Sequence, residues 1–413
     1  MKIALICRSY WDDLPRNPDE ECFGGEAQQL AEAVAAHGHE VVVLSQSPEV
    51  GALKRVDEGK LELWVSPSRR RRSLFSGLRD QMAKKKFAHY RVHSDVAYLR
   101  EFMKKRGPFD VAWAPNELPD GIVAALAAQR GVPMPPLLTQ VQNLRQHFRK
   151  QQPIFDQKPA LRLVFRRSAR LIACSDQMAE AMANYAGSGL RLEDLQAKTH
   201  VMHPVLKREF MRAAFDESLI GPWPDRVLFL GKLDMAGGVL VFMKAILKAQ
   251  TALRSSTFVV AGGFRPHEGL SFEPRWEDAQ EAVATQVAAA RTEYLGQVST
   301  FEVARQIKMA SLVVVPALFS PFGRGVVEAL ALGRPVVVTD QVGSWGIVQN
   351  YNCGMIVPPY NSTALAQAID HVLASSAIYA ANADHIATGL IEDFSPETTA
   401  LHLVNHLSDI ARR

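Results

Sequence analysis

The chain has 413 residues, of which 47% are hydrophobic and 22% are charged, and its net charge is +4 at pH 7. This composition and length are typical of a globular protein with two domains. The sequence contains no apolar run of the roughly 18 residues that a membrane-spanning helix needs. The four cysteines lie far apart, and no cluster of His, Cys, Asp or Glu has metal-ligand spacing, so we expect reduced thiols in a cytoplasmic protein without a bound metal. The start, MKIALICRSYWDD, is typical of a first strand rather than of a signal peptide.

Short β-branched runs alternate with helical patterns through the first half of the chain. The expected strands lie at 2–7, 41–46, 109–115, 135–141 and 169–175, and the expected helices include 24–40 and 121–131. Strands that alternate with helices form βαβ units, whose parallel sheets are covered by helices on both faces. We therefore predict a doubly wound, Rossmann-like α/β domain over residues 1–214.

A second series of strands and helices follows a polar segment, 215–226, which contains two prolines and is typical of a linker. The expected strands lie at 226–231, 257–263, 293–298, 311–317 and 335–340, with helices at 238–253, 275–291, 302–310 and 324–332. They predict a second doubly wound domain over 227–394, and the remaining segment, 395–413, has a helical pattern. Ligands of such sheets bind at the carboxyl ends of the strands, so two facing domains predict a ligand in the cleft between them.

The stretch FSPFGRGVVEALALGRPVVVTD, residues 319–340, predicts a turn that leads directly into an apolar helix. The N-terminus of a helix exposes N–H groups that suit a phosphate, and Gly323 and Gly325 let the backbone approach a ligand closely. Glu328, further along the helix, can accept hydrogen bonds from two hydroxyls of a ribose. A nucleoside diphosphate offers both groups. The alternative is that Glu328 only complements the helix dipole.

The same stretch resembles the Glu-x-Phe-Gly-x4-Glu-Ala motif of retaining GT-B glycosyltransferases of the family-4 type, the group 1 glycosyl transferases. The motif is matched at Phe322, Gly323, Glu328 and Ala329, and Gly333, Pro335 and Val336 follow as in the family. Further segments resemble the family in the same order along the chain: KIALICRSYW with FGGEAQQLAEAVAAHGHEVVVLS, RRSARLIACSDQM, VLFLGKLDMAGG and GMIVPPYNSTALAQAI. The resemblance implies GT-B architecture, in which two Rossmann-like domains face a cleft and the helix at 395–413 returns to the N-terminal domain.

The resemblance also implies a donor-binding set and a catalytic set of residues. Donor binding is expected from Gly24, Gly25, Gly231, Lys232, Phe322, Gly323, Arg324, Gly325 and Glu328, and catalysis from Lys232, Arg324 and Ser320. The candidates on the acceptor side, in the N-terminal domain, are Gln140, Gln142, Asn143 and His147. The alternatives are a tight turn for Gly24-Gly25, a solvated surface position for Arg324 and a structural role for His147.

Three positions depart from the family pattern. Ser320 stands where the family has a glutamate that contacts the donor sugar, Lys232 where it has an arginine that clamps the diphosphate, and Gly237 where it has a lysine. Lysine keeps the cation but loses the bidentate fork of arginine, and Arg324 is a candidate substitute for the missing lysine. We therefore expect the nucleotide half of the site to be kept better than the sugar half.

The implied function is a metal-independent, retaining hexosyl transfer from a nucleotide-diphosphate sugar, of UDP or GDP type, to a glycan or lipid-linked acceptor. The expected setting is cell-envelope polysaccharide or lipopolysaccharide assembly, and no cofactor besides the donor is expected. Two alternatives stay open. One is a nucleotide-sugar epimerase on the same fold, and the other is a non-catalytic GT-B relative that binds nucleotide or glycan as a partner protein.

Residues 69–106 carry thirteen Lys or Arg and three acidic residues, a local charge of +10, with apolar residues between the basic clusters. Such a segment suits an anionic membrane surface, which predicts peripheral attachment at the inner face of the cytoplasmic membrane or an anionic glycolipid acceptor. A solvated protein face is the alternative. Nucleic acid is not expected as a partner, because no segment resembles a nucleic-acid-binding motif.

Overall fold

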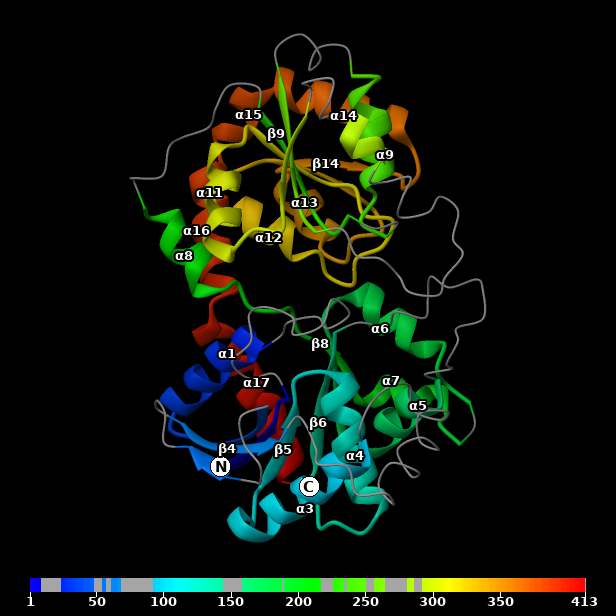
Figure 1. Ribbon diagram of the computed structural model, residues 1–413, viewed down its shortest axis with the longest axis vertical. Coiled ribbons are helices and arrows are strands. Elements are labelled where there is room, and N and C mark those ends of the chain that lie inside the picture. The colour runs from blue at the N-terminus through cyan, green and yellow to red at the C-terminus, as the bar shows by residue number, and fades with distance from the viewer. Residues whose placement is uncertain are drawn as a thin grey trace. The chain divides into compact units, whose positions relative to one another are not determined.

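The computed structural model describes residues 1–8, 24–47, 54–56, 61–67, 92–142, 144, 158–187, 189–216, 226–233, 236–249, 256–263, 281–285 and 292–412. These residues form two compact units (Figure 1). The first consists of Met1–Val205 together with Pro396–Arg413, and the second is Leu206–Ser395. Each unit has its own sheet with helices packed on it, so the predicted class, two α/β domains with parallel sheets, is confirmed.

The sheet of the first unit has the strand order β3-β4-β2-β1-β5-β6-β7-β8 among the described residues. The strands are β1 (Lys2–Ile6), β2 (Glu40–Ser47), β3 (Lys54–Val56), β4 (Glu62–Pro67), β5 (Val111–Ala114), β6 (Leu137–Val141), β7 (Arg170–Ala173) and β8 (Thr199–Val201). Neighbouring strands are parallel except β3 and β4, which form an antiparallel pair. Because β1 lies between β2 and β5, the order of the strands reverses at β1.

Helices cover both faces of this sheet. They are α1 (Gly24–Ala36), α3 (Val92–Arg106), the short π-helical turn η1 (Glu117–Gly121), α4 (Ile122–Gln129), α5 (Lys158–Arg167), α6 (Asp176–Ala183), α7 (Leu192–Lys198) and α17 (Pro396–Ala411). Figure 1 shows α17, in red, beside α1, in blue, although the two lie far apart in sequence. Leu403 and Leu407 of α17 join Ile3 and Leu5 of β1 in one buried core, so the first unit is built from two separate stretches of the chain.

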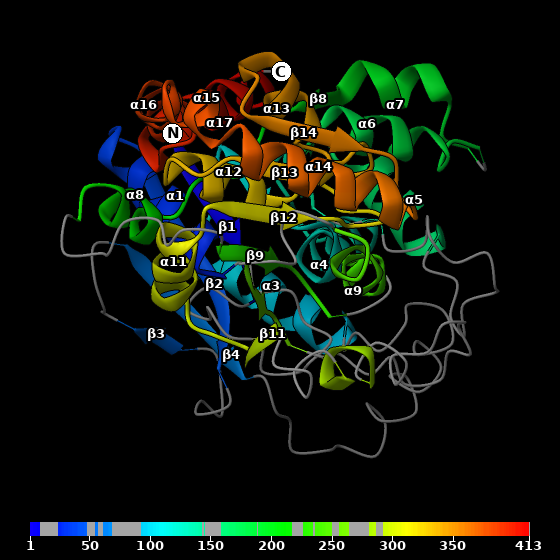
Figure 2. The same ribbon diagram turned by 90° about the horizontal axis from the view of Figure 1, so that it is seen from above.

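The sheet of the second unit has the strand order β11-β10-β9-β12-β13-β14, and all of its described pairs are parallel. The strands are β9 (Arg226–Leu230), β10 (Thr257–Ala261), β11 (Thr292–Gly296), β12 (Leu312–Val315), β13 (Val336–Thr339) and β14 (Gly354–Val357). The helices are α8 (Arg208–Ala214), α9 (Val239–Ile246), α11 (Thr300–Met309), α12 (Arg324–Ala331), α13 (Trp345–Tyr351), α14 (Ser362–Ala374), α15 (Ser376–Ala380) and α16 (Ala383–Asp393). Figure 2 shows β12, β13 and β14 side by side.

Two sets of helices pack on the second sheet. Helices α9 and α14 contact each other and share a core with Phe229, Phe258 and Val314 of the strands. Helices α11 and α12 contact β9, β12 and β13 from outside that core. The strand residues are buried on both faces because both faces are covered, which is why the strands read as continuous β-branched runs in the sequence.

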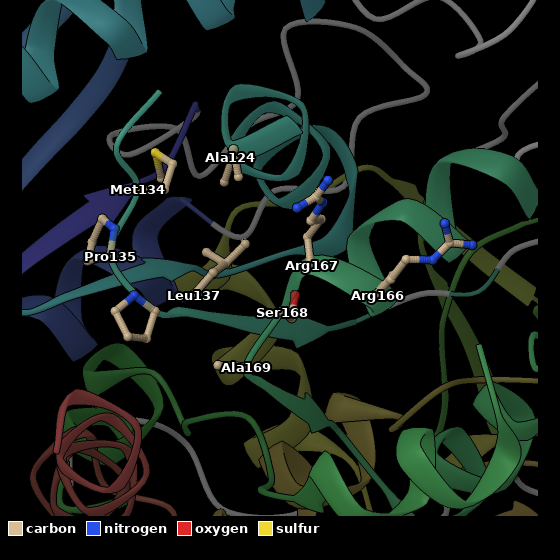
Figure 3. Close-up of a pocket in the computed structure, with 10 residues that line it drawn as sticks. Ala124, Met134, Pro135, Leu137, Arg166, Arg167, Ser168 and Ala169 are labelled. Atoms are coloured by element: carbon tan, nitrogen blue, oxygen red, sulfur yellow. The ribbon is translucent and has the colours of Figure 1, made fainter. Parts of the chain in front are cut away.

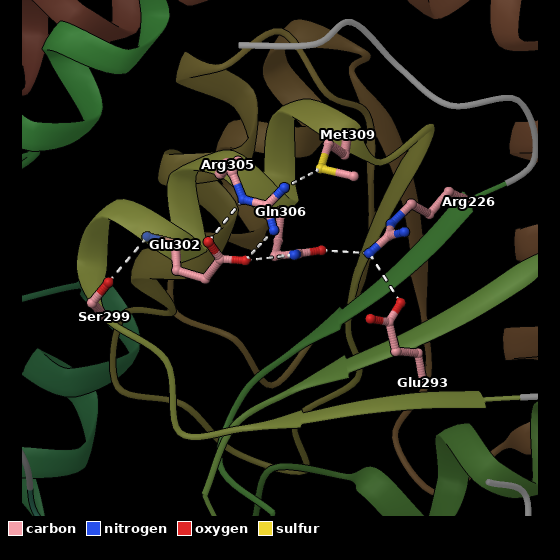
Figure 4. A network of polar contacts seen from close by, with 7 residues as sticks. All are labelled: Arg226, Glu293, Ser299, Glu302, Arg305, Gln306 and Met309. Carbon is pink, nitrogen blue, oxygen red and sulfur yellow. Dashed lines mark hydrogen bonds and ion pairs between the residues drawn. The ribbon is translucent and has the colours of Figure 1, made fainter.

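A polar network ties α11 to the amino end of β9 (Figure 4). Arg226 Nη2, at the start of β9, donates to Gln306 Oε1 of α11 and to Glu293 Oε2 of β11, at 2.5 and 3.3 Å. Glu302 accepts from Arg305 Nε at 2.8 Å and from Gln306 Nε2 at 2.7 Å, and the hydrogen bond from Arg305 is the main reason that the pKa of Glu302 is lowered. This network fixes the edge of the sheet that lies opposite the carboxyl ends of the strands.

The two units divide between Val205 and Leu206, earlier than the predicted linker at 215–226. Helix α8 lies between this division and the predicted linker, and it packs with α11 and α12. Lys308 Nζ of α11 donates to the carbonyl oxygen of Ala213 at 3.0 Å, which attaches the end of α8 to the second unit. Sequence reasoning assigned this stretch to the N-terminal domain because the prolines further on were the stronger linker signal.

Several predicted elements differ in their bounds. The helix expected at 24–40 ends at Ala36, since Gly38 adopts a φ of +84° and β2 begins soon after. The helix expected at 238–253 ends at Ile246. Most of the helix expected at 275–291 lies outside the described residues.

Candidate functional site

In the second unit, strands β9 and β12 lie side by side at the point where the strand order reverses. From β9 the chain proceeds to β10 and β11 on one side of the sheet, and then returns to form β12 on the other side. In open α/β sheets, this reversal leaves a crevice at the carboxyl ends of the two strands, where ligands bind. The segment that begins at Gly231 follows β9, and the segment from Pro316 to Gly323 follows β12, so both reach this crevice.

The segment after β12 is held by hydrogen bonds on two sides. Leu318 N donates to the carbonyl oxygen of Ala236 at 2.7 Å, and the hydroxyl of Thr339, at the end of β13, donates to the carbonyl oxygen of Ala317. Ser320 N donates to Gln341 O at 3.0 Å. The predicted catalytic residue Ser320 is therefore fixed in position by its own backbone, which bridges to the loop after β13.

Two glycines in the left-handed region begin the two helices at this crevice. Gly238 has a φ of +76° and caps α9, and Gly323 has a φ of +83° and caps α12. A Cβ on Gly238 would overlap the carbonyl oxygen of Pro316, and a Cβ on Gly323 would overlap the side chain of Val342. Neither cap uses a side chain, so the first backbone N–H groups of both helices are left to other partners.

The structure brings the predicted donor residues to this edge from two elements. Gly231 and Lys232 directly follow β9, and Lys232 is exposed. Arg324 is the first residue of α12, and Glu328 lies in its second turn, where it is half-buried. No acidic residue stands in the first turn of α12, so complementing the helix dipole is a weak explanation for Glu328.

Two of the predicted donor-binding residues make packing contacts within the second unit. The ring of Phe322 is buried and packs against Phe394, with 6.1 Å between the ring centroids. A Cβ on Gly325 would lie 3.0 Å from Leu230 Cδ2, so this glycine allows α12 to approach β9. These packing contacts could not be predicted from the sequence, because the neighbours are distant in the chain, and donor binding by both residues stays a prediction.

The acceptor-side candidates lie at the end of β6 in the first unit. Gln140 is buried, and its Oε1 accepts from Trp113 Nε1 at 2.8 Å. Gln142 is also buried, and its backbone N donates to Glu117 Oε2 at 2.8 Å. Asn143 and His147 lie outside the described residues.

The glycine pair Gly24-Gly25 begins α1, as predicted for the first helix. Glu26, in the first turn of this helix, is buried and accepts from Val205 N at 3.3 Å. The start of α1 is thereby attached to the segment that follows β8. Whether the pair faces a donor stays a prediction.

A buried polar cluster that the sequence reasoning missed lies at the carboxyl ends of β1 and β5, where the strand order of the first unit reverses. Arg8 N donates to Asp120 Oδ1 at 3.0 Å, and Asn116 Nδ2 donates to Asp120 Oδ2 at 2.7 Å. Arg8 Nε donates to Gln46 Oε1 at 2.7 Å, and Gln46 Nε2 donates to Asp95 Oδ1 at 2.8 Å. The available sequence signal was the polar stretch NELPDG, which directly follows an apolar strand.

Burial raises the pKa of Asp120 from 3.8 to about 7. The backbone hydrogen bond from Arg8, the charge of Arg8 and the hydrogen bond from Asn116 act in the opposite direction, while the charge of Asp95 raises the pKa further. Asp120 therefore changes its protonation state near neutral pH, although only 2% of its surface is exposed.

A cavity of about 460 Å³ in the first unit lies away from all predicted site residues (Figure 3). Its lining includes Ala124, Met134, Leu137, Arg167 and Ser168. It opens between α4 and α5 near the amino ends of β6 and β7, at the edge opposite the polar cluster. This position does not suit a ligand that binds at the carboxyl ends of the strands.

No group of three or more His, Cys, Asp or Glu side chains in the described part of the chain is arranged to hold a metal ion. Among the helices that the structure describes, none is both long and apolar enough to cross a bilayer.

Two family models match the sequence. Residues 25–192 match a model described as a glycosyl transferase 4-like domain, and residues 224–375 match one described as glycosyl transferases group 1. Together they span more than three quarters of the chain.

Individual proteins are similar over nearly the whole length. Glycogen synthase of Mycobacterium tuberculosis (strain CDC 1551 / Oshkosh) is 26% identical over 389 residues, which is 92% of this chain and 88% of that protein. The solved structure of sucrose-phosphate synthase from Thermosynechococcus elongatus has a TM-score of 0.72 at 18% identity, covering 99% of this chain and 98% of that one. Anabaena Alr3699/HepE, solved in complex with UDP and glucose, has a TM-score of 0.67 at 17% identity, covering 99% of this chain and 100% of that one. At these identities the two structures show a shared fold.

Proposed function

Since this chain belongs to the group 1 glycosyltransferases of the GT4 type, with the GT-B fold, we propose that it transfers a sugar from a nucleotide-diphosphate sugar to a glycan or lipid-linked acceptor. The observation that carries this proposal is the meeting of two segments at the β9–β12 crevice. One brings Lys232, and the other brings Ser320, Arg324 and Glu328. Cations, helix N–H groups and a carboxylate at one sheet edge match the charge pattern of a nucleoside diphosphate.

The donor is proposed to lie with its diphosphate at the N-termini of α9 and α12 and its ribose at Glu328. Both helices begin with glycines that leave N–H groups unused by a side-chain cap, which supports the diphosphate position. A UDP-type donor is the first choice, supported by the similar Anabaena protein that was solved with UDP and glucose. A GDP-type donor is the second choice.

The proposed reaction is a metal-independent transfer with retention at the anomeric carbon. The bond from this carbon to the phosphate oxygen breaks as the bond to the acceptor oxygen forms on the same face, and the acceptor proton passes to the leaving phosphate. The protein then has to stabilise the negative charge that develops on the diphosphate. Lys232, Arg324 and the backbone of 323–325 are suited to this role, and Ser320 is short and neutral beside the transferred sugar.

A binding titration with UDP, GDP, ADP and CMP tests the donor site. We expect one nucleotide to bind, and Glu328→Ala to weaken its binding about 10- to 100-fold through the loss of two hydrogen bonds. Glu392→Ala, at an exposed position of α16, is the matched control and should bind as the wild type does. If none of the four nucleotides binds the wild type, the non-catalytic alternative is favoured.

The acceptor is proposed to be a cell-envelope glycan or glycolipid, reached at an anionic membrane surface. The basic residues of 69–91 support this proposal, but they lie outside the described residues. In α3, by contrast, Arg106 pairs with Glu40 and Glu62, both at 2.6 Å, and Lys105 pairs with Glu101 at 2.7 Å. The end of the basic segment therefore has partners within the protein, and the membrane proposal depends on its first part.

Co-sedimentation with anionic liposomes tests the membrane proposal. We expect binding at low salt that is lost as the salt concentration rises, since basic residues each contribute about 1 kcal/mol near an anionic surface. Replacing the four arginines at 69–72 by serine should weaken the binding. The same substitutions should leave nucleotide binding unchanged. Wild-type protein that stays in the supernatant at low salt would contradict the proposal.

A further inference from the structure

Asp120 joins the end of β1 to the segment that follows β5. Its Oδ1 accepts from the backbone N of Arg8 at 3.0 Å, and its Oδ2 accepts from Asn116 Nδ2 at 2.7 Å. Its own backbone N donates to Asn116 Oδ1 at 3.2 Å, which closes a ring of hydrogen bonds across η1. Both carboxylate oxygens therefore act as acceptors, a pattern that fits the ionised form of the side chain.

Arg8 is held at the carboxyl end of β1 by more than Asp120. Its Nε donates to Gln46 Oε1 of β2, and its Nη2 lies 3.8 Å from Asp95 Oδ2 of α3. The hydroxyl of Ser45 donates to its carbonyl oxygen at 3.2 Å. Contacts from β2, α3 and η1 thus converge on the residue at which the chain leaves β1.

The charged groups around Asp120 come from each element packed against it. Arg8 favours the ionised carboxylate, while Asp95 disfavours it. Glu117, three residues before Asp120, accepts from the backbone N of Gln142 at the end of β6. Among the described residues, the Arg8 cation thus lies beside three buried carboxyl groups at this strand edge, those of Asp95, Glu117 and Asp120.

Ionisation of Asp120 lowers the free energy of unfolding. The pKa of Asp120 in the folded state, about 7, lies above its ordinary value of 3.8, so the folded protein holds the proton more tightly than the unfolded chain does. The stability from this group is fully present below about pH 4 and is lost as the pH rises through 7. An asparagine of the same shape would avoid that loss, so the carboxylate weakens the fold at the pH where both of its oxygens accept.

We propose that Asp120, in its ionised form, is a positioning residue of the transferase, which fixes the backbone of Arg8 at the carboxyl end of β1, the edge at which ligands of such sheets bind. The inference rests on the proposed function. A proton on either oxygen removes the acceptor of Arg8 N or of Asn116 Nδ2. Asp120 is too deeply buried to touch a substrate, so it acts through Arg8 rather than on the reacting atoms.

The test measures nucleotide release from a sugar conjugate of the nucleotide that binds in the titration, with water as the acceptor, between about pH 5.5 and 9. In the wild type, turnover should fall about tenfold for each pH unit below 7. In Asp120→Asn this fall of turnover at acidic pH, the acid limb of the profile, should disappear. Turnover at pH 8 should be about tenfold lower than in the wild type. The melting temperature of Asp120→Asn at pH 8 should equal or exceed that of the wild type, because the ionisation cost that is removed outweighs the one hydrogen bond that the amide nitrogen cannot accept.

Asp110→Asn is the matched control. Asp110 Oδ2 accepts from the backbone N of Lys2 at 2.7 Å, so it makes the same type of contact at the opposite end of β1. This variant should keep the wild-type pH profile, including any limb that comes from the donor phosphates.

Two results would overturn the inference. One is an acid limb that persists in Asp120→Asn, and the other is a parallel loss of melting temperature and turnover at every pH, which indicates a purely structural role. Nucleotide binding separates this inference from the proposed function. A wild type that neither binds nucleotide nor releases it removes the proposed function, and this inference with it.

Discussion

Replacing Gly238 by alanine is expected to destabilise the second unit by about 3 kcal/mol or more. Gly238 has a φ of +76°, which an alanine adopts only with strain, and its Cβ would overlap the carbonyl oxygen of Pro316. The obstructing atom belongs to the backbone and cannot rotate away. To make room, the segment after β12 would have to shift, although the bond from Leu318 N to Ala236 O holds it. Nucleotide binding should be lost together with stability, because this segment leads into α12.

Alanine substitutions at two other glycines distinguish the strain of a positive φ from the overlap with Pro316. Gly38 has a similar φ of +84°, but a Cβ there would meet nothing within 4 Å, so Gly38→Ala should cost only about 1 kcal/mol. Gly346, in α13, has neither a positive φ nor a close neighbour, and Gly346→Ala should leave the free energy of unfolding within about 1 kcal/mol of the wild-type value. Urea unfolding measures all three variants. Equal losses for Gly38→Ala and Gly238→Ala would show that the close approach to Pro316 contributes nothing.

Lys232→Ala should lower turnover about 100- to 1,000-fold while the melting temperature stays unchanged. Lys232 is exposed at the carboxyl end of β9, so its removal leaves no cavity. A cation at this place stabilises the negative charge on the leaving diphosphate, and removal of one such group costs about 3–4 kcal/mol in other transition states. Release of nucleotide from the nucleotide sugar measures the effect.

Lys232→Arg keeps the charge and should retain most of the turnover. Lys244→Ala removes a second exposed lysine of the same unit, on α9, and should leave turnover as in the wild type. Turnover near the wild-type level in Lys232→Ala would remove this residue from the mechanism.

The sequence predicted the parts of the fold that depend on local pattern. Buried strands such as β12 and β13 consist of β-branched residues, and their alternation with helices was enough for the two-domain α/β class. The pair β3–β4 was missed, because β3 has only three residues, Lys54–Val56, and two of them are basic. The place of α8 was missed because it depends on contacts with α11 and α12.

The residues of the candidate sites also differ in whether a local sequence pattern can predict them. Gly323 and Glu328 belong to one short stretch, so a motif reveals them together. Arg8 and Asp120 are 112 positions apart, and only the pairing of β1 with β5 brings them into contact. Phe322 belongs to the same motif, and its ring packs against Phe394, a contact that the motif does not predict.

The division of the first unit into two stretches of sequence has a consequence for synthesis on the ribosome. The second unit is continuous, so all of Leu206–Ser395 emerges before α17 does. Until then, the face of the first sheet that Leu403 and Leu407 will cover stays exposed in the nascent chain. The earlier domain is therefore completed last, and we expect its uncovered apolar face to be prone to aggregation until α17 packs on it.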